Sequence, residues 1–309
     1  MTAAWTLAEM PRLAGRRALV TGVTSGLGGH VATELARAGA DVVLAARNPE
    51  KLAETAAAIT AEVPAAVLHP LRLDLADLGS VRLAAEEAAA LGPLDILVNN
   101  AGVMATPHER TRDGFELQFG TNHLGHFALT GLLLEALSAS GGARVVTVSS
   151  QMARSVRGVS LRDPRTQGER YRKWNAYGQS KLANLLFTYE LDRRASAKGL
   201  PLTAVAAHPG YSHTNLVASG MNRGGRRLDG TIALAVTSLV GQSSERGALP
   251  LLMAAAAPGL RGGTYVGPDG PFQLHGEAAV VPPPRAALDE TMAAGLWDLS
   301  EEATGVRYP

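Results

Sequence analysis

The chain of 309 residues has no cysteine, few aromatic residues (5%) and a formal net charge of only +1. The absence of cysteine excludes disulfide bonds and catalysis by a thiol. Because the 18% of charged residues are nearly balanced in sign, the chain lacks polyelectrolyte character and we expect no nucleic-acid partner. No apolar run in residues 1–17 is long enough for a signal peptide or a membrane span, and charges interrupt the alanine-rich stretches elsewhere. We therefore expect a soluble, cytoplasmic protein without a membrane partner.

The histidines lack the spacing of metal ligands. His123 and His126 are three positions apart, as two ligands on one helix face would be. No local carboxylate or cysteine completes a zinc ligand set around them. We therefore predict no bound metal.

A glycine-rich turn follows the first apolar run of the chain. The run Arg17 to Val20 is mainly apolar, glycines interrupt the pattern, and helix-forming residues continue from Leu27 to Ala38. In such a unit the glycines let backbone amides approach a pyrophosphate, and the helix N-terminus offers unpaired N–H groups. The spacing Gly-x-x-x-Gly-x-Gly differs from the commoner Gly-x-Gly-x-x-Gly, so an ordinary tight turn is the alternative. The residues that we expect to bind a dinucleotide are Gly22, Thr24, Ser25, Gly26, Leu27 and Gly28.

Tyr177 and Lys181 are four positions apart and therefore share one face of a helix. The lysine ammonium would lower the pKa of the tyrosine hydroxyl, whose ordinary value of about 10 makes it a poor base. The pair is thus a candidate general acid and base. Taken alone, the same spacing also fits a solvated pair on a helix surface.

Apolar runs alternate with helical patterns along the chain. After a first strand at 17–20, we expect strands at 41–46, 66–71, 94–98, 143–148, 202–207 and 264–266, with helices at 49–61, 78–90, 114–138 and 175–197. This alternation predicts an α/β fold, a Rossmann-type doubly wound parallel sheet of about seven strands. The five runs from 41–46 to 202–207 are expected to be buried on both faces. We expect a single domain over 1–309, with 1–15 as an N-terminal extension.

Polar or turn-forming residues follow the expected strands in order. The glycine turn follows the first strand, and the next five strands are followed by Arg47, Asp74, Asn99, Ser150 and Pro209. Doubly wound sheets bind their ligands at the carboxyl ends of the strands. We therefore expect these residues to surround one ligand site.

The chain resembles the short-chain dehydrogenase/reductase family in six motifs that occur in the right order. They are Thr-Gly-x-x-x-Gly-x-Gly at 21–28, Asn-Asn-Ala-Gly at 99–102, the helix asparagine Asn122, Ser149-Ser150, the Tyr177/Lys181 pair and Pro209-Gly210. The stretches 174–184 and 208–210 are most similar to the retinol-dehydrogenase-like branch. The resemblance implies an NAD(P)-dependent enzyme that transfers hydride between an alcohol and a carbonyl, either an aldehyde or a ketone.

The resemblance also implies the roles of individual residues. Tyr177 would act as the general acid/base, Lys181 would bind the nicotinamide ribose, and Ser150 would hydrogen-bond the substrate oxygen. Asn122 would hold a water that relays protons to Lys181, and the helices carrying Asn122 and Tyr177 often pair subunits, so a homo-oligomer is possible. The further cofactor contacts implied are Asp74 and Leu75 at the adenine, Asn100, Ala101 and Gly102, Tyr177 and Lys181, Pro209 and Gly210 over the nicotinamide, and Thr214 at its carboxamide. As a bare sequence feature, Asp74 fits a helix cap equally well.

The end of the second strand bears on the choice of cofactor. An acidic residue there would bind the ribose 2′-hydroxyl of NAD, but this chain has alanines followed by Arg47, which can grip a 2′-phosphate with two hydrogen bonds. We therefore expect NADP rather than NAD. The alternative is a solvated loop arginine, since Ser25 stands where a second basic residue could precede Gly26.

Three segments should shape the substrate site. Residues 151–174 are an insertion relative to shorter family members, with seven basic and two acidic residues, and they form either a solvated loop or a cationic rim that favours an acidic or phosphorylated substrate or steers the cofactor. Residues 211–230, which include Gly220, Gly224 and Gly225, predict a substrate lid. The tail predicts an amphipathic helix near 288–299 that closes the fold.

These observations favour an NADP-dependent oxidoreductase acting on a small carbonyl or alcohol. A second class is a regulator that senses NADP(H) without turnover, which would not need the Asn122, Ser150, Tyr177 and Lys181 set. Among enzymes, the alternative is NADP(H)-dependent reduction of a C=C bond, as in protochlorophyllide reductases.

Overall fold

The structure is a computed structural model of the chain, and it describes residues 5–165, 171–211 and 243–308. The strands are β1 (Arg17–Thr21), β2 (Asp41–Ala46), β3 (Val67–Arg72), β4 (Ile96–Asn99), β5 (Ala143–Val148), β6 (Leu202–Ala207), β7 (Tyr265–Pro268) and β8 (Ala278–Val280). The main helices are α1 (Leu27–Arg37), α2 (Pro49–Glu62), α3 (Leu78–Ala90), α4 (Leu117–Phe119), α5 (Gly125–Leu132), α6 (Leu134–Ala139), α7 (Lys173–Ala197), α10 (Ser244–Ala256) and α11 (Glu290–Thr304).

The strands form one eight-stranded sheet in the order β3-β2-β1-β4-β5-β6-β7-β8. All neighbouring pairs are parallel except β7 and β8, which are antiparallel. The order reverses direction between β1 and β4, and this is the place where doubly wound sheets open a ligand crevice. The predicted Rossmann-type fold is therefore confirmed.

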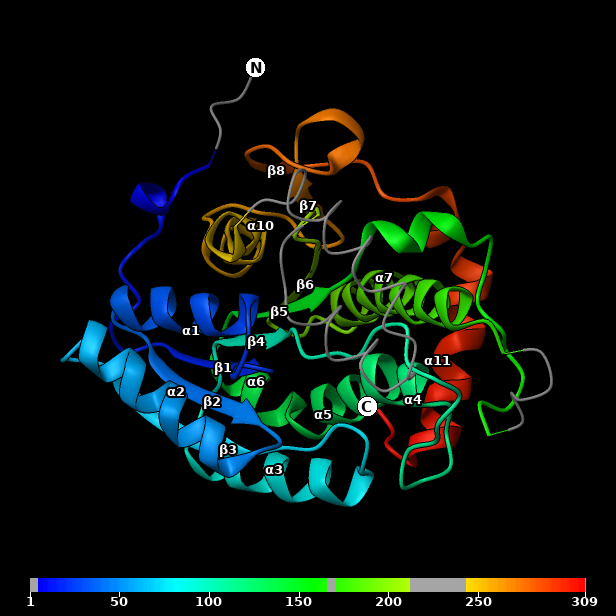
Figure 1. Cartoon of the computed structure of the whole chain (residues 1–309), viewed down its shortest axis with the longest axis horizontal. Helices are drawn as coiled ribbons and strands as arrows, with labels where there is room; N and C mark the ends of the chain where they lie inside the picture. The colour runs from blue at the N-terminus through cyan, green and yellow to red at the C-terminus, as the bar shows by residue number, and fades with distance from the viewer. Residues whose placement is uncertain (1–4, 166–170, 212–242, 309) are drawn as a thin grey trace, which may run out of the picture.

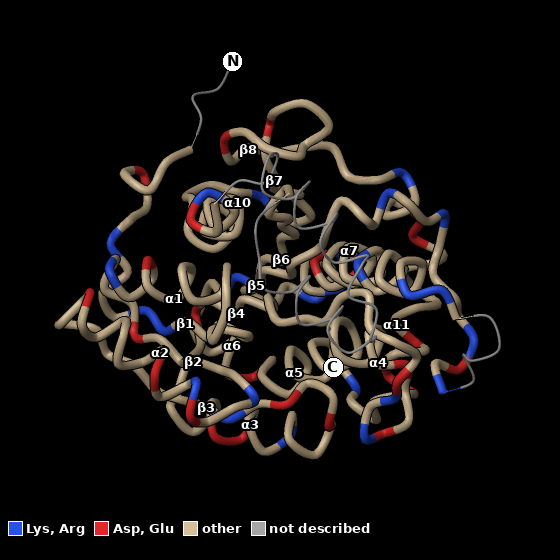
Figure 2. Tube along the Cα trace, in the orientation of Figure 1, with Lys and Arg blue, Asp and Glu red and all other residues tan. Residues whose placement is uncertain are grey.

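Helices cover both faces of the sheet (Figure 1). Alternate strand residues face opposite layers, so Ala18 and Val20 pack with α1, α2 and α10, whereas Leu19 packs with α3, α5, α6 and α7. Acidic and basic residues lie mainly in helices and loops, and β4 and β6 contain none (Figure 2). The charge distribution thus matches a sheet buried between two helical layers.

Local sequence signals set several helix ends. The Asn48 side chain accepts a hydrogen bond from the Lys51 N–H at 2.7 Å, directly before Pro49 begins α2. Asp77 caps α3 in the same way. Gly305 ends α11 in the left-handed conformation (φ 65°), and α11 extends to Thr304, five residues beyond the helix expected near 288–299.

Three expectations about the elements need correction. The third strand was expected to be buried on both faces, but β3 is an edge strand and Val67 is 55% exposed. The last strand, β8, was not expected, because its three residues are too few to show a pattern. The helix expected over 114–138 is divided into α4, a π-helical turn at Gly120–Leu124, α5 and α6.

The C-terminal helix α11 packs on α7 and α5. Trp297 of α11 is 2% exposed and stacks on Phe187 of α7, with ring centres 5.9 Å apart. It also meets Phe127 of α5 edge-on at 5.2 Å. α11 therefore covers a face of the two helices that were expected to pair subunits. Among the helices that the structure describes, none is both long and apolar enough to cross a membrane.

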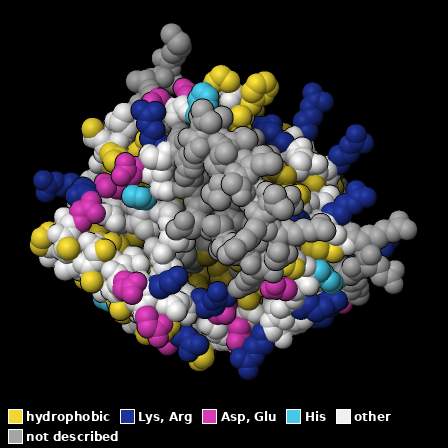
Figure 3. Space-filling model, in the orientation of Figure 1, with side chains coloured by type: hydrophobic (Ala, Val, Ile, Leu, Met, Phe, Trp, Pro, Cys, Tyr) yellow, Lys and Arg dark blue, Asp and Glu magenta, His cyan; other side chains and the backbone are white. Residues whose placement is uncertain are grey.

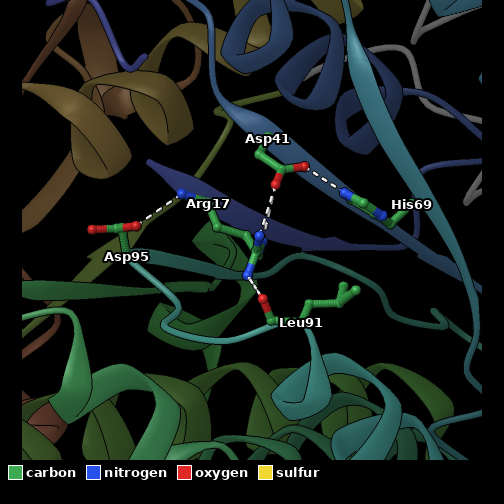
Figure 4. A network of polar contacts seen from close by, with 5 residues as sticks. All are labelled: Arg17, Asp41, His69, Leu91 and Asp95. Carbon is green, nitrogen blue, oxygen red and sulfur yellow. Dashed lines mark hydrogen bonds and ion pairs between the residues drawn. The ribbon is translucent and has the colours of Figure 1, made fainter. Parts of the chain in front are cut away.

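A polar network ties the strands together at their amino ends (Figure 4). The Arg17 guanidinium pairs with Asp41 at 2.9 Å, and the other carboxylate oxygen of Asp41 contacts His69 Nε2 at 2.6 Å. The Arg17 guanidinium also donates to the Leu91 carbonyl, and the Arg17 backbone N–H donates to Asp95 at 2.8 Å. Because this network lies at the strand ends opposite the expected ligand site, we assign it to the stability of the sheet.

Candidate active site

The glycine turn joins β1 to α1 with a backbone that only glycine adopts readily. Gly22 has φ 74°, and Gly26 has φ 57° with ψ −126°. Gly26 stands at the N-cap of α1 without a side-chain capping bond, so the first N–H groups of the helix stay available for an anion. The Gly22 N–H donates to the Ala45 carbonyl at 2.8 Å, which places the turn beside the end of β2. These residues fit a bound dinucleotide phosphate.

The turn also contacts the Asn-Asn-Ala-Gly loop after β4. Thr21 Oγ1 accepts the backbone N–H groups of Asn100 and Ala101, each at 2.9 Å. The Asn100 side chain in turn donates to the Thr21 carbonyl at 2.7 Å. Two loops that are far apart in the sequence are thereby fixed as one surface.

Gly28 allows this close approach, and its replacement tests it. A Cβ at Gly28 would lie 2.4 Å from the Gly22 carbonyl oxygen and 2.5 Å from Asn100 Nδ2. We expect Gly28→Ala to lower the free energy of unfolding by about 1–3 kcal/mol, because the backbone must shift to admit the methyl group. Denaturant unfolding measures this loss. Gly142→Ala is the matched control, since no atom lies within 4 Å of a Cβ there; equal stability of the two variants would contradict the prediction.

Asn122 lies in the π-helical turn and is completely buried. Its Oδ1 accepts the Val103 N–H at 2.8 Å, and its Nδ2 donates to the Val103 carbonyl and to Ser180 Oγ, both at 2.9 Å. Both amide hydrogens are therefore used within the protein. A π-helical turn re-aims side chains and is frequent at functional sites. The role of holding a water for Lys181 stays a prediction.

His126, one turn after Asn122, connects the π-helical turn to the glycine turn. Its Nδ1 lies 2.9 Å from the Asn122 carbonyl oxygen, so Nδ1 must carry the proton. Burial lowers the pKa of His126 to about 4, which leaves the ring neutral and Nε2 free to accept from Thr21 Oγ1 at 3.0 Å. His126 therefore has a structural role, which the sequence did not indicate.

Tyr177, Lys181 and Ser150 come together at the carboxyl end of β5. Tyr177 and Lys181 are 4% and 3% exposed, and Lys181 Nζ lies 5.9 Å from the centre of the Tyr177 ring. The pair is therefore buried on the inner face of α7, not solvated on a helix surface. Ser150 is half-buried, two positions after the last residue of β5, and its hydroxyl interacts with that of Tyr177.

Lys181 has a fixed partner that the sequence did not reveal. Its Nζ donates to the Val148 carbonyl at 3.0 Å, and Asn184 Nδ2 donates to the same oxygen at 3.0 Å. A Cβ on Gly102 would lie 3.6 Å from Lys181 Nζ and 3.0 Å from Asn122 Oδ1. The Asn-Asn-Ala-Gly loop, Asn122 and Lys181 are thus neighbours.

Burial controls the protonation of this pair. It raises the pKa of Tyr177 to about 12, partly opposed by the Ser150 hydroxyl, and it lowers the pKa of Lys181 to about 8. Loss of solvation therefore sets the pKa of Tyr177 above its ordinary value, and a lowering of this pKa by the Lys181 ammonium stays a prediction. At neutral pH Tyr177 therefore carries its proton, as an acid must, and Lys181 is mostly charged.

The expected cofactor residues after β2 and β3 differ in exposure and in their contacts. Arg47 is exposed directly after β2, beside the glycine turn. Asp74 follows β3 and accepts the Ala76 N–H at 3.0 Å, but Asp77 is the residue that caps α3. The helix-cap interpretation of Asp74 is therefore wrong. Leu75 is 6% exposed and belongs to the hydrophobic core.

The substrate side is described only in part. Pro209 and Gly210 follow β6 as expected, with Gly210 at φ 68°. Thr214 and residues 212–230 of the expected lid lie outside the described residues. The insertion contributes Arg154 and Arg157 to an open cleft of about 460 Å³, which Arg285 and Asp289 also line. Figure 3 shows Lys and Arg side chains projecting from the upper right edge of this face.

Within residues 5–165, 171–211 and 243–308, no group of three or more His, Cys, Asp or Glu side chains could hold a metal ion.

The sequence is similar to that of known dehydrogenases. A family model described as short chain dehydrogenase matches residues 16–162. Polyprenol dehydrogenase of Mus musculus is 42% identical over 305 residues, covering 96% of this chain and 86% of that protein. Retinol dehydrogenase 13 of Homo sapiens is 39% identical over 300 residues, covering 96% and 86%.

The fold is also similar to that of solved structures. The crystal structure of an uncharacterized protein from Mycobacterium paratuberculosis has a TM-score of 0.81 and 44% identity, and the match covers 99% of this chain and 100% of that one. A structure described as an NAD(P)-dependent gluconate 5-dehydrogenase from Beutenbergia cavernae, with NADP bound at low occupancy, has a TM-score of 0.62 and 29% identity over 79% and 91% of the chains. The chain is an oxidoreductase of the short-chain dehydrogenase/reductase family, which binds a nicotinamide cofactor, and it belongs to the retinol-dehydrogenase-like branch.

Proposed function

We propose that the protein interconverts an aldehyde or ketone and the corresponding alcohol, with NADP as cofactor and Tyr177 as general acid/base. The observation that carries this proposal is the grouping of the buried Tyr177 and Lys181 with the half-buried Ser150 at the carboxyl end of β5, on the same edge of the sheet as the glycine turn. A regulator without turnover would not need a buried tyrosine and lysine, whose burial costs free energy.

The side chains divide the proton chemistry between them. In reduction, the Tyr177 hydroxyl gives its proton to the oxygen that becomes the alcohol, and in oxidation the tyrosinate takes that proton back. The Lys181 ammonium stabilises the tyrosinate, and the Ser150 hydroxyl hydrogen-bonds the substrate oxygen as negative charge develops on it. The nicotinamide cofactor, when bound, supplies the hydride for reduction or accepts it in oxidation. One proton and one hydride thus complete the two-electron reduction.

Two relatives point to a class of substrates. They are named for retinol and polyprenol, both long, apolar alcohols. We propose an apolar, unsaturated alcohol or its aldehyde as the substrate. The test is a screen of the purified protein with NADPH against retinal, a polyprenal, short aldehydes and steroid ketones. We expect NADPH oxidation that depends on a carbonyl and is fastest with the long aldehydes; no carbonyl consumption across the set would refute the proposal.

Arg47 should decide the choice of cofactor. Arg47→Asp removes a cation that can neutralise the 2′-phosphate of NADP and introduces a carboxylate that repels it and can accept from the 2′-hydroxyl of NAD. We expect relative affinity to shift toward NAD by about 2 to 4 kcal/mol, or roughly 30-fold to 1000-fold. Isothermal titration of both cofactors at fixed ionic strength measures this shift.

The matched control for Arg47 is Arg12→Asp, the same charge change at an exposed arginine before β1. It should leave the ratio of the two affinities unchanged. If the parent protein binds NAD+ as tightly as NADP+, Arg47 is an ordinary surface arginine and the NADP proposal is wrong, even where the oxidoreductase chemistry is right.

A further inference from the structure

Three loops at the carboxyl end of the sheet meet at one side-chain atom, Oε1 of Gln273. Gln151 Nε2 and Arg154 Nη2 reach it from the 3₁₀ helix η3 (Gln151–Ser155) after β5, each at 3.2 Å. His208 Nε2 reaches it from the segment after β6, also at 3.2 Å. Gln273 itself lies in the 3₁₀ helix η5 (Pro271–Gln273) after β7. One amide oxygen therefore accepts hydrogen bonds from the loops of two neighbouring strands.

The geometry fixes the orientation of the His208 ring. The Gly210 N–H donates to His208 Nδ1 at 3.2 Å, so Nδ1 is an acceptor. Burial lowers the pKa of His208 to about 4, and the neutral ring must then carry its single proton on Nε2, toward Gln273. Tyr265 packs against the ring with centres 5.0 Å apart, and a Cβ on Gly267 would lie only 2.1 Å from Nε2. His208 therefore has little room for another position.

The orientation of the Gln273 amide is fixed as well. Its Nε2 donates to the Pro282 carbonyl at 3.3 Å, which leaves Oε1 facing the three donors. Arg154 Nη2 donates to the same carbonyl at 2.6 Å, and Arg154 Nε donates to Gln151 Oε1 at 2.9 Å. Gln151 Nε2 also donates to the Phe272 carbonyl at 2.8 Å. Each member of this network thus has at least two partners.

The backbone of η5 has a conformation that needs support from surrounding contacts. Phe272 (φ 52°, ψ 16°) and Gln273 (φ 57°) both lie in the left-handed region, which residues other than glycine rarely adopt. Such a conformation persists only where the surroundings impose it. The Phe272 side chain is 88% exposed, so burial of this ring does not impose it. The hydrogen bonds to the Gln273 side chain and to the Phe272 carbonyl therefore support the turn, beside backbone bonds such as that from the Gln273 N–H to the Gly270 carbonyl at 2.9 Å.

The two loops joined at Gln273 carry residues of the proposed active site. Gln151 directly follows Ser150, and His208 directly precedes Pro209 and Gly210. We propose that Gln273 is a positioning residue, whose Oε1 sets the place of Ser150 and of the Pro209-Gly210 turn relative to each other. The catalytic part of this inference rests on the proposed function, whereas the coupling of the loops does not.

Gln273→Met tests the proposal, because Met has a similar length but no oxygen to accept the three hydrogen bonds. We expect kcat for a verified carbonyl substrate to fall roughly 10-fold to 100-fold, the scale of a small displacement of a reacting group, with little change in the KM of that substrate. Gln273→Glu keeps an acceptor oxygen at the same place and should recover most of the lost kcat. Phe272→Ala is the control in the same turn and should leave kcat unchanged.

A second measurement does not depend on turnover. In the parent protein, the imidazole N–H of His208 should give a slowly exchanging proton signal in NMR spectra, because it is buried and bonded to Gln273. Gln273→Met should lose this signal, whereas Gln273→Glu and Phe272→Ala should keep it. A Gln273→Met protein that keeps its kcat overturns the positioning role, and one that keeps the slowly exchanging signal overturns the coupling. If neither the parent nor any variant reduces a carbonyl, the proposed function fails. The NMR comparison still tests whether Gln273 couples the loops after β5 and β6.

Discussion

Tyr177→Phe should lower kcat for carbonyl reduction by about 100-fold or more, while the fold and the cofactor affinity are kept. The substitution removes only the hydroxyl that donates the proton, and the phenylalanine ring fills the same buried space. Burial raises the pKa of Tyr177 to about 12, so at neutral pH the parent enzyme holds the proton ready for donation. Steady-state rates and cofactor titration of the purified variant measure the two effects separately.

Tyr189→Phe is the matched control, since Tyr189 lies on the same helix α7. Among the residues that the structure describes, its buried hydroxyl has no hydrogen-bond partner. Its loss should leave kcat within about twofold of the parent, because no proton transfer is assigned to it. A Tyr177→Phe protein that turns over as fast as Tyr189→Phe would remove Tyr177 from the mechanism.

Lys181→Ala is expected to lower kcat by a similar factor, about 100-fold, because the ammonium that stabilises the tyrosinate is lost. The carbonyl of Val148 keeps a donor in this variant, since Asn184 also donates to it at 3.0 Å. The loss of activity should therefore exceed any loss of stability. Thermal unfolding, measured beside the kinetics, separates the two.

The pH profile gives Lys181 a second test. Burial lowers its pKa to about 8, so its positive charge is present below that pH and lost above it. In the parent enzyme, reduction should weaken as the pH rises through about 8, and this limb should be absent from Lys181→Ala. The optimum for oxidation by the variant should move to higher pH, because a tyrosinate without the ammonium forms less readily. Unchanged profiles with intact activity would contradict the assignment.

Local sequence patterns were sufficient to predict the strands and the shared helix face of the candidate catalytic pair. Apolar runs gave the parallel strands, and the spacing of four placed Tyr177 and Lys181 on one face of α7. The positions after the strand ends predicted which loops would meet, because the carboxyl ends of parallel strands share one edge of the sheet. Hydrophobic periodicity did not predict the π-helical turn at Gly120–Leu124, since one extra residue per turn hardly alters the pattern.

Other features depend on contacts between distant parts of the chain. The Gln273 network joins residues 151, 154, 208 and 273, and no local pattern connects them. The protonation of Tyr177 depends on its burial beneath several elements, and the sequence indicated only the nearby lysine. The edge position of β3 follows from the strand order, which a run of apolar residues does not specify.

The central claim, that Tyr177 serves hydride transfer to a carbonyl, is tested most directly by following the hydride itself. Retinal offers both a carbonyl and conjugated C=C bonds, so it separates the proposed reaction from C=C reduction. The enzyme would be given retinal and NADPH that carries deuterium at its transferable position, and the product would be analysed by mass spectrometry and NMR. We predict an alcohol with deuterium on the carbinol carbon, formed by the parent and the Tyr189→Phe control but not by Tyr177→Phe. Deuterium at a former C=C carbon, or labelled alcohol formed equally fast by Tyr177→Phe, would contradict the claim.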